Sequence, residues 1–125
     1  MREIKFRGKP IEDYGDIKWF YGGIDLYHDK KLAYISAPYN GHIQVEWASI
    51  GQYTGLKDKN GQEIYEGDVY HQGDLNILYV VVYKDTSFIG KQIRASSYAG
   101  LEYWKDRIEV IGDIYRNPDL LEVAE

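Results

Sequence analysis

The chain has 125 residues, 44% of them hydrophobic and 15% aromatic, which predicts one folded domain, with or without a small extra lobe, and excludes a disordered chain. It contains no cysteine, which excludes a disulfide framework, a thiolate nucleophile and a cysteine-based zinc or iron–sulfur site. Its formal net charge is −5, which argues against a protein that binds nucleic acid mainly through phosphate contacts.

The first residues are charged and too poor in apolar side chains to form the core of a signal peptide. No apolar run approaches the length that is needed to cross a bilayer. We therefore expect a cytoplasmic protein of a bacterial host cell that makes no contact with a membrane.

The first half of the chain is predicted to form an antiparallel meander. The expected strands cover residues 4–7, 18–27, 32–36 and 42–47. Gly22 and Gly23 lie inside the second strand and predict a bend or bulge there. The Asn40-Gly41 pair supplies the positive φ angles of a tight hairpin turn, and apolar residues alternate along the strand that follows it.

The second half is also predicted to be rich in strands. These strands cover residues 69–71, 75–83, 87–94 and 107–115. Residues 78–82 are apolar at every position, which predicts a central strand, or one whose outer face is covered by another part of the protein or another subunit. Residues 98–105 fit a helical turn or an irregular loop. Asn117 and Pro118 suit the N-cap and first position of a short terminal helix through Val123.

Two turns are predicted near the centre of the chain. Asp58-Lys59-Asn60-Gly61 is typical of a turn in which the aspartate bonds its own backbone, and Glu66-Gly67-Asp68 is a second tight turn. Several short strands at regular spacing predict a mainly β fold, either a small barrel or a sandwich, with a domain boundary near residues 49–51.

Several separate blocks of sequence are more specific than this general pattern. They are residues 52–61 (QYTGLKDKNG), 64–68 (IYEGD) and 108–115 (IEVIGDIY) followed by Asn117-Pro118, together with residues 2–7 and 19–23. With this spacing, the chain resembles the YopX family of phage and prophage proteins over nearly its full length. Residues 28–47 and 84–105 carry no motif that matches the family.

The resemblance implies a fold as well as a family. It implies an SH3-like small β-barrel over residues 51–125 with a short C-terminal helix, and additional N-terminal antiparallel strands over residues 1–50 that share one core with the barrel. It implies no catalytic residue and no cofactor, since the family has no established biochemical role.

Two groups of residues are candidate metal or catalytic centres. Glu63, Glu66 and Asp68 could bind a hard cation if their carboxylates converged, but turn formation explains them more simply. His28, His42 and His71 lack the spacing of a zinc site or of a nucleophile with its base, which favours surface or rim positions. We therefore predict neither a metal nor a catalytic residue.

Aromatic residues are the remaining site candidates, because small barrels often bind peptides or nucleic acid strands through exposed tyrosine and tryptophan. The candidate binding residues are Tyr53, Tyr65 and Tyr70, which flank the central turns, and Trp104. Core packing is nevertheless the favoured interpretation for most of them, since a small barrel needs large side chains inside it.

The sequence thus favours a non-enzymatic phage accessory protein, a protein-binding or assembly module for a host or phage partner, which could act as a homo-oligomer. The alternative is a nucleic-acid-associated regulator that uses a local basic and aromatic surface despite the acidic total. The residues of that surface would be Lys84, Lys91, Arg94, Tyr83 and Tyr98.

Overall fold

The structure is a computed structural model that describes residues 3–122, and its chain divides into two compact units, residues 1–53 (unit 1) and 54–125 (unit 2). The fold is mainly β, as the sequence predicts, and its strands form two antiparallel sheets. The division falls within β5 (Gly51–Lys57), whereas the sequence placed a boundary near residues 49–51. That the two parts share one core stays a prediction.

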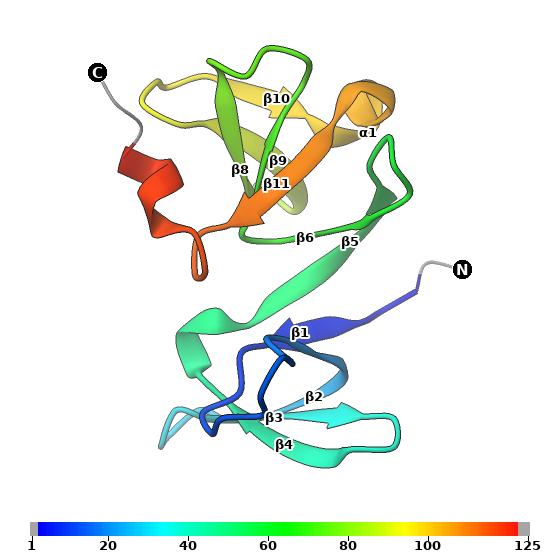
Figure 1. Ribbon diagram of the computed structural model, residues 1–125, viewed down its shortest axis with the longest axis vertical. Helices are drawn as coiled ribbons and strands as arrows, with labels where there is room; N and C mark the ends of the chain where they lie inside the picture. The colour runs from blue at the N-terminus through cyan, green and yellow to red at the C-terminus, as the bar shows by residue number, and fades with distance from the viewer. Residues whose placement is uncertain (1–2, 123–125) are drawn as a thin grey trace. The chain divides into compact units, whose positions relative to one another are not determined.

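Figure 1 shows the elements along the chain and labels most of them. Unit 1 contains β1 (Phe6–Gly8), β2 (Phe20–Tyr27), β3 (Leu32–Ala37), β4 (Gly41–Val45) and the 3-10 helix η1 (Trp47–Ser49). Unit 2 contains β6 (Glu63–Tyr65), β7 (Asp68–His71), β8 (Leu78–Lys84), β9 (Ser87–Gln92), β10 (Tyr98–Gly100), α1 (Leu101–Trp104), η2 (Lys105–Arg107), β11 (Glu109–Asp113) and η3 (Pro118–Glu122). None of the helices in the described part of the chain is long and apolar enough to span a membrane.

Unit 1 is the predicted antiparallel meander. Its strands lie in the order β4-β3-β2-β1-β5, and β5 continues into unit 2, where it lies beside β6. Ile24, Ile35 and Ile43 are cross-strand partners on one face, so they meet in one row of the sheet. The alternation predicted for β4 is confirmed, but the strand ends at Val45 because residues 47–49 turn into η1.

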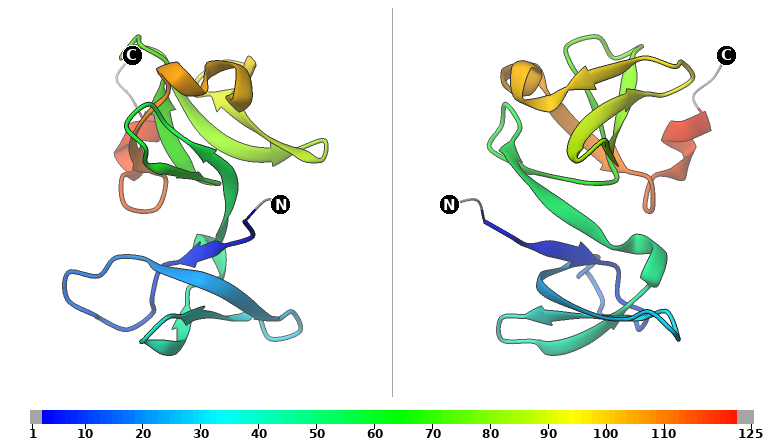
Figure 2. Two further views of the ribbon diagram at one scale, coloured as in Figure 1. Left: turned by 90° about the vertical axis from the view of Figure 1, so that its right-hand side faces the viewer. Right: turned by 180° about the vertical axis from the view of Figure 1, so that it is seen from behind.

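The core of unit 1 lies on one face of this meander. Its buried members are Phe20, Ala33, Ile35, Ala37, Ile43 and Val45, with Phe6, Ile24, Trp47 and Ile50 packed against them. The loop that joins β1 to β2 is visible in Figure 2. It packs back on this region, since Pro10 forms a bridge to Val45 and the ring of Tyr14 meets that of Phe20. The inward face therefore supplies the stability of unit 1 and leaves the outward face of β2, β3 and β4 available for other roles.

Unit 2 is built on a five-stranded sheet in the order β10-β9-β8-β7-β11. The central position predicted for the apolar strand is confirmed, because β8 pairs with both β7 and β9. Within residues 3–122 the strands of this sheet do not close by hydrogen bonds, since β10 and β11 are its two edges, and the SH3-like barrel stays a prediction. β10 has only three residues before α1 begins at Leu101, which leaves little backbone to pair with β11.

A second cluster forms the core of unit 2. Its buried members are Ile64, Tyr70, Val81, Leu101 and Ile108, with Leu56, Tyr79, Phe88, Trp104 and Val110 packed against them. The ambiguous residues 98–105 form β10, α1 and the start of η2, and Leu101 anchors this turn of helix in the core.

The C-terminal helix differs in detail from the prediction. Pro118–Glu122 forms a 3-10 helix, and Val123 lies outside the described residues. The Asn117 side chain does not act as the expected N-cap. Its Oδ1 instead accepts the backbone N–H of Asp113 at 3.2 Å, which ties the helix start to the end of β11.

Candidate functional site

The aromatic residues predicted to form a binding site lie mainly in the interior. Tyr53, Tyr65 and Tyr70 are 5%, 2% and 0% exposed, and Trp104 packs against the core of unit 2. The favoured interpretation, that most of these side chains fill the core, is confirmed for the three tyrosines, and the exposure that a binding site at these residues needs is wrong. The structure therefore does not gather the four residues on its surface.

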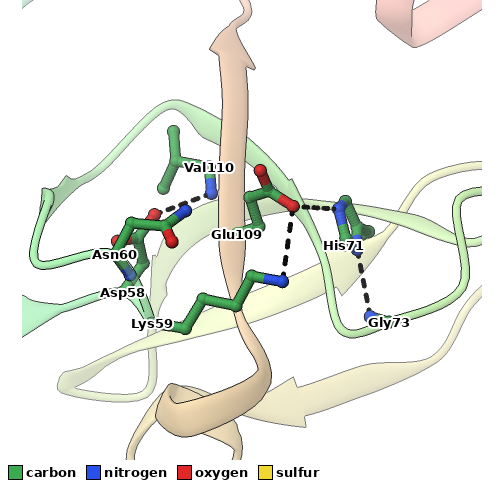
Figure 3. A network of polar contacts seen from close by, with 7 residues as sticks. All are labelled: Asp58, Lys59, Asn60, His71, Gly73, Glu109 and Val110. Carbon is green, nitrogen blue, oxygen red and sulfur yellow. Dashed lines mark hydrogen bonds and ion pairs between the residues drawn. The ribbon is translucent and has the colours of Figure 1, made fainter.

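A network of polar contacts in unit 2 surrounds His71 (Figure 3). His71 Nε2 lies 3.0 Å from Oε1 of Glu109, its cross-strand partner, and Lys59 Nζ lies 3.6 Å from the same oxygen. The other ring nitrogen, Nδ1, accepts the backbone N–H of Gly73 at 3.0 Å. Because Nδ1 is an acceptor, Nε2 carries the proton and donates it to the carboxylate.

This geometry limits what His71 can do chemically. Both ring nitrogens are engaged by the protein and the side chain is buried, so a substrate would have to displace Gly73 or Glu109 to reach it. The position predicted for His71, on a surface or rim, is wrong. Its network joins β7 to β11 and fixes the loop at Gly73, which is a structural role.

Asp58 occupies the other side of the same view (Figure 3). Its Oδ1 accepts the N–H groups of Asn60 and Gln62, each at 2.9 Å, and its Oδ2 accepts the N–H of Val110 at 3.0 Å. The turn predicted at residues 58–61 is thus confirmed, with Gly61 at a φ of 83°. The same carboxylate also holds this turn against β11.

The acidic residues considered as cation ligands serve the same purpose. Asp68 Oδ2 accepts the N–H of Tyr65 at 2.8 Å, and Glu63 Oε1 accepts the hydroxyl of Tyr65 at 2.9 Å. Among residues 3–122, no three histidine, aspartate or glutamate side chains converge on a common point. The geometry therefore gives no support to a metal at Glu63, Glu66 and Asp68.

A cluster that sequence reasoning missed lies on the outward face of unit 1. Tyr27, Tyr34 and His42 come from β2, β3 and β4, and we call them, with Leu32 and Asp25, the tyrosine face. The rings of Tyr34 and His42 stack at 4.4 Å with an angle of 16°. The ring of Tyr27 meets that of Tyr34 nearly edge-on, at 5.9 Å and 85°.

Strand pairing explains why these residues share a face. Asp25 pairs with Tyr34, Tyr27 pairs with Leu32, and Ser36 pairs with His42. Residues two apart on a strand point to the same side, so all of them lie opposite the core residues Ile35 and Ile43. The alternation of residues 32–36 and 42–47 in the sequence predicts which side chains share the outward face. It does not predict which aromatic rings on that face contact one another.

A carboxylate and a surface pocket complete the tyrosine face. Asp25 Oδ2 accepts the hydroxyl of Tyr27 at 3.3 Å and lies 3.5 Å from His42 Nε2. The charge of Asp25, with this hydrogen bond, raises the pKa of Tyr27 above its ordinary value of 10.0. A pocket of about 460 Å³ is lined by Tyr27, Asp29, Lys30, Leu32, Tyr34 and His42.

The basic and aromatic residues proposed for nucleic acid are partly brought together in unit 2. Lys91 pairs with both Tyr98 and Val80, and the Lys84 ammonium lies 5.4 Å from the centre of the Tyr98 ring. These residues share the outward face of β8, β9 and β10. Tyr83 lies on the opposite face against Phe88, and Arg94 lies in the loop between β9 and β10.

The comparisons with known proteins now decide the family. The YopX protein family model matches residues 6–122. The chain belongs to the YopX family. Among solved structures, this YopX-family chain is similar to protein EF1440 from Enterococcus faecalis, with a TM-score of 0.59 and 24% identity over 97% of this chain and 99% of that one. This likeness shows a common fold, and no curated protein matches the chain.

Proposed function

We propose that this YopX-family chain is a non-enzymatic protein-binding module of phage or prophage origin, active in the bacterial cytoplasm, and that the tyrosine face of unit 1 contacts the partner. The observation that supports this most is the cluster of Tyr27, Tyr34 and His42 over a pocket on the outward side of three paired strands. The partner is a host or phage protein.

The chemistry of this face suits protein recognition. Tyrosine offers a large apolar contact area and a polar tip while losing little conformational entropy on binding, and it is enriched where interfaces gain most of their affinity. Tyr27 is 46% exposed, and Tyr34 and Leu32 are half-buried, so the face combines accessible aromatic surface with a rigid strand scaffold.

The non-enzymatic part of the proposal is supported by the polar groups of unit 2. His71 has both ring nitrogens engaged, and the carboxylates of Asp58 and Asp68 bind backbone N–H groups at turns. Groups that are saturated by the protein's own donors are poorly placed to act as general acid, general base or metal ligand.

The proposal also includes a finer description of the fold. We propose that unit 2 is an open form of the SH3-type barrel that the family resemblance implies. In its support, four consecutive strands form a meander, the last strand returns beside the first, and short helical turns separate β10 from β11.

Self-association is a second mode of binding for the same module. The outward face of the sheet of unit 2 carries three apolar side chains that are half-buried, those of Val80, Val82 and Ile89. A group of partly exposed apolar side chains on one face is typical of a surface that contacts another protein. We propose a homo-oligomer that covers this face. Analytical ultracentrifugation up to high micromolar concentration is expected to show concentration-dependent association, and a monomer throughout would remove this part.

A nucleic-acid-associated regulator is the second candidate function. It is favoured by the shared face of Lys84, Lys91 and Tyr98, since a cation beside an exposed ring can bind a phosphate and stack on a base. It is disfavoured by the net charge of −5.

One experiment separates these candidates. The tagged full chain is used as bait in a host-cell lysate, with and without nuclease, and the captured proteins are identified by mass spectrometry. Three baits accompany the wild type: Tyr27→Thr/Tyr34→Thr, which keeps β-forming residues, Lys84→Gln/Lys91→Gln, and the control Tyr39→Asn. Tyr39 is fully exposed at a φ of 67°, where asparagine is tolerated.

The proposal predicts a partner that survives nuclease, is lost with the double tyrosine variant and is kept by the control. Recovery that nuclease abolishes, and that the double lysine variant also loses, would move the nucleic-acid function to first place. A partner that all three variants recover as well as the wild type would overturn the assignment of the tyrosine face.

A further inference from the structure

The tyrosine face has a geometry suited to one kind of ligand group. Tyr27 and Tyr34 meet nearly at right angles, so their rings form a corner beside the pocket, and Leu32 contributes an apolar lining. Aromatic rings carry negative charge density on their faces and attract cations placed within about 6 Å of the ring centre. A corner of two rings therefore favours a cationic group that can lie against both.

The charges around this corner have the same preference. Asp25 accepts the hydroxyl of Tyr27 and lies 3.5 Å from His42 Nε2. Asp29 lines the pocket together with the basic residues Lys30 and His42. The charge of Asp25 is the largest cause of the raised pKa of Tyr27. The electrostatic potential at the Tyr27 hydroxyl is therefore negative. A cation entering the pocket would gain from both carboxylates and from the rings.

We propose that the pocket of the tyrosine face binds the cationic side chain, arginine or lysine, of a partner protein. This inference rests on the proposed function and adds the chemical class of the group that is recognised. The planar guanidinium of arginine can stack on a tyrosine ring and still reach a carboxylate, whereas the lysine ammonium acts as a point charge.

The test uses small probes in place of the unidentified partner. N-acetyl-arginine methylamide, N-acetyl-lysine methylamide and N-acetyl-citrulline methylamide are titrated into the isotope-labelled full chain, and chemical shifts are followed by NMR. Citrulline has almost the shape of arginine but no charge, so it is the matched neutral control. The variants are Tyr27→Thr and Asp25→Asn, with Tyr39→Asn as a control outside the pocket.

The expected result is saturable shifts confined to residues 25–34 and 42 for at least one cationic probe, with none for citrulline. Asp25→Asn should weaken binding about fivefold, the effect of losing one unit charge near 4 Å in a water-like dielectric. Loss of one ring in Tyr27→Thr should weaken it about two- to fivefold. The comparison of arginine with lysine then decides between the two side chains.

Two results would overturn the inference. One is equal shifts with citrulline, and the other is cation binding that neither variant weakens relative to Tyr39→Asn. Neither result would overturn the proposed function, because the capture experiment tests it independently and can still show a protein partner that depends on Tyr27 and Tyr34. Failure of the capture experiment, in contrast, does not alter the outcome of the probe titration.

Discussion

Three buried aspartates in unit 2, Asp58, Asp68 and Asp113, each accept backbone hydrogen bonds at a turn. Asp113 adds an ion pair, with its Oδ2 at 2.8 Å from Arg116 Nε. All three aspartates belong to the sequence blocks that resemble the YopX family. At the scale of single residues, these blocks are therefore explained by the folding of turns, and they need no catalytic role.

The substitution Asp58→Asn tests this structural role. The asparagine Oδ1 can still accept the two N–H groups that Asp58 Oδ1 binds, but its NH₂ group replaces Oδ2 and faces the N–H of Val110, donor against donor. The free energy of unfolding should therefore fall by about 1–3 kcal/mol. The control Asp74→Asn affects an exposed side chain that accepts one N–H, and it should change stability by less than about 0.5 kcal/mol. Urea unfolding measures both, and equal losses would contradict the account.

Two neighbouring glycines give a second matched pair. A Cβ on Gly22, at a φ of 155°, would lie 2.1 Å from the backbone oxygen of Ser36, whereas a Cβ on Gly23 meets nothing within 4 Å. Gly22→Ala should cost about 1–3 kcal/mol or more, because backbone must move. Gly23→Ala should leave stability unchanged or raise it by about 0.5 kcal/mol. Thermal unfolding that ranks the two variants in the opposite order would refute the close approach.

Tyr70 predicts a dependence on pH. Its hydroxyl is buried beside Gly90, has no hydrogen-bond partner among the described residues, and burial raises its pKa well above the ordinary 10.0. The folded state therefore keeps the phenol neutral, while the unfolded state ionises near pH 10. The contribution of neutral Tyr70 to the free energy of unfolding is complete below pH 10 and is lost as the pH rises above that value.

Tyr70→Phe should consequently be at least as stable as the wild type near pH 7 and lose less stability in alkali. The difference should grow by about 1.4 kcal/mol for each pH unit above 10. Urea unfolding at about pH 8 and about pH 11 measures it, with Tyr103→Phe as an exposed control. Parallel losses in Tyr70→Phe and the wild type would contradict the assignment.

At the scale of elements, the hairpin between β8 and β9 is strained. Its two turn residues, Asp85 and Thr86, have φ angles of 52° and 68°, and a β-branched side chain is unfavourable in this region. Asp85→Asn combined with Thr86→Gly supplies the residues that such a turn prefers. We expect a gain of about 1 kcal/mol in chemical unfolding, and a loss would show that the turn is held by side-chain contacts instead.

Strand alternation and turn residues predicted most elements, as the hairpin of β3 and β4 shows. The Pro38 to Gly41 turn was expected to place positive φ at Asn40 and Gly41, but Tyr39 takes it together with Gly41. Core packing of most of the candidates Tyr53, Tyr65 and Tyr70 was predicted from the large side chains that a small barrel needs. Which of the 13 tyrosines face inward could not be predicted, because the local pattern does not say so. The contact of Tyr34 with His42 likewise depends on cross-strand register.

At the scale of the whole molecule, each unit has its own buried cluster, and the two have different surfaces. Unit 1 carries the tyrosine face with the carboxylate of Asp25, and unit 2 carries the face of Lys84, Lys91 and Tyr98. The tyrosine face lies largely within residues 28–47, which carry none of the blocks that resemble the family. The central claim is that this face contacts a partner protein.

Site-specific photo-crosslinking tests that claim most directly. A benzophenone amino acid replaces Ser36, which is exposed on the tyrosine face beside His42, or Ser87, which is exposed on the outward face of unit 2 beside Lys84. Each chain is irradiated in host cells, and the adducts are identified by mass spectrometry. The account predicts a specific protein adduct from position 36 that is absent from position 87. An adduct with a host or phage protein from position 87 alone would contradict it, whereas a self-adduct there belongs to the proposed homo-oligomer.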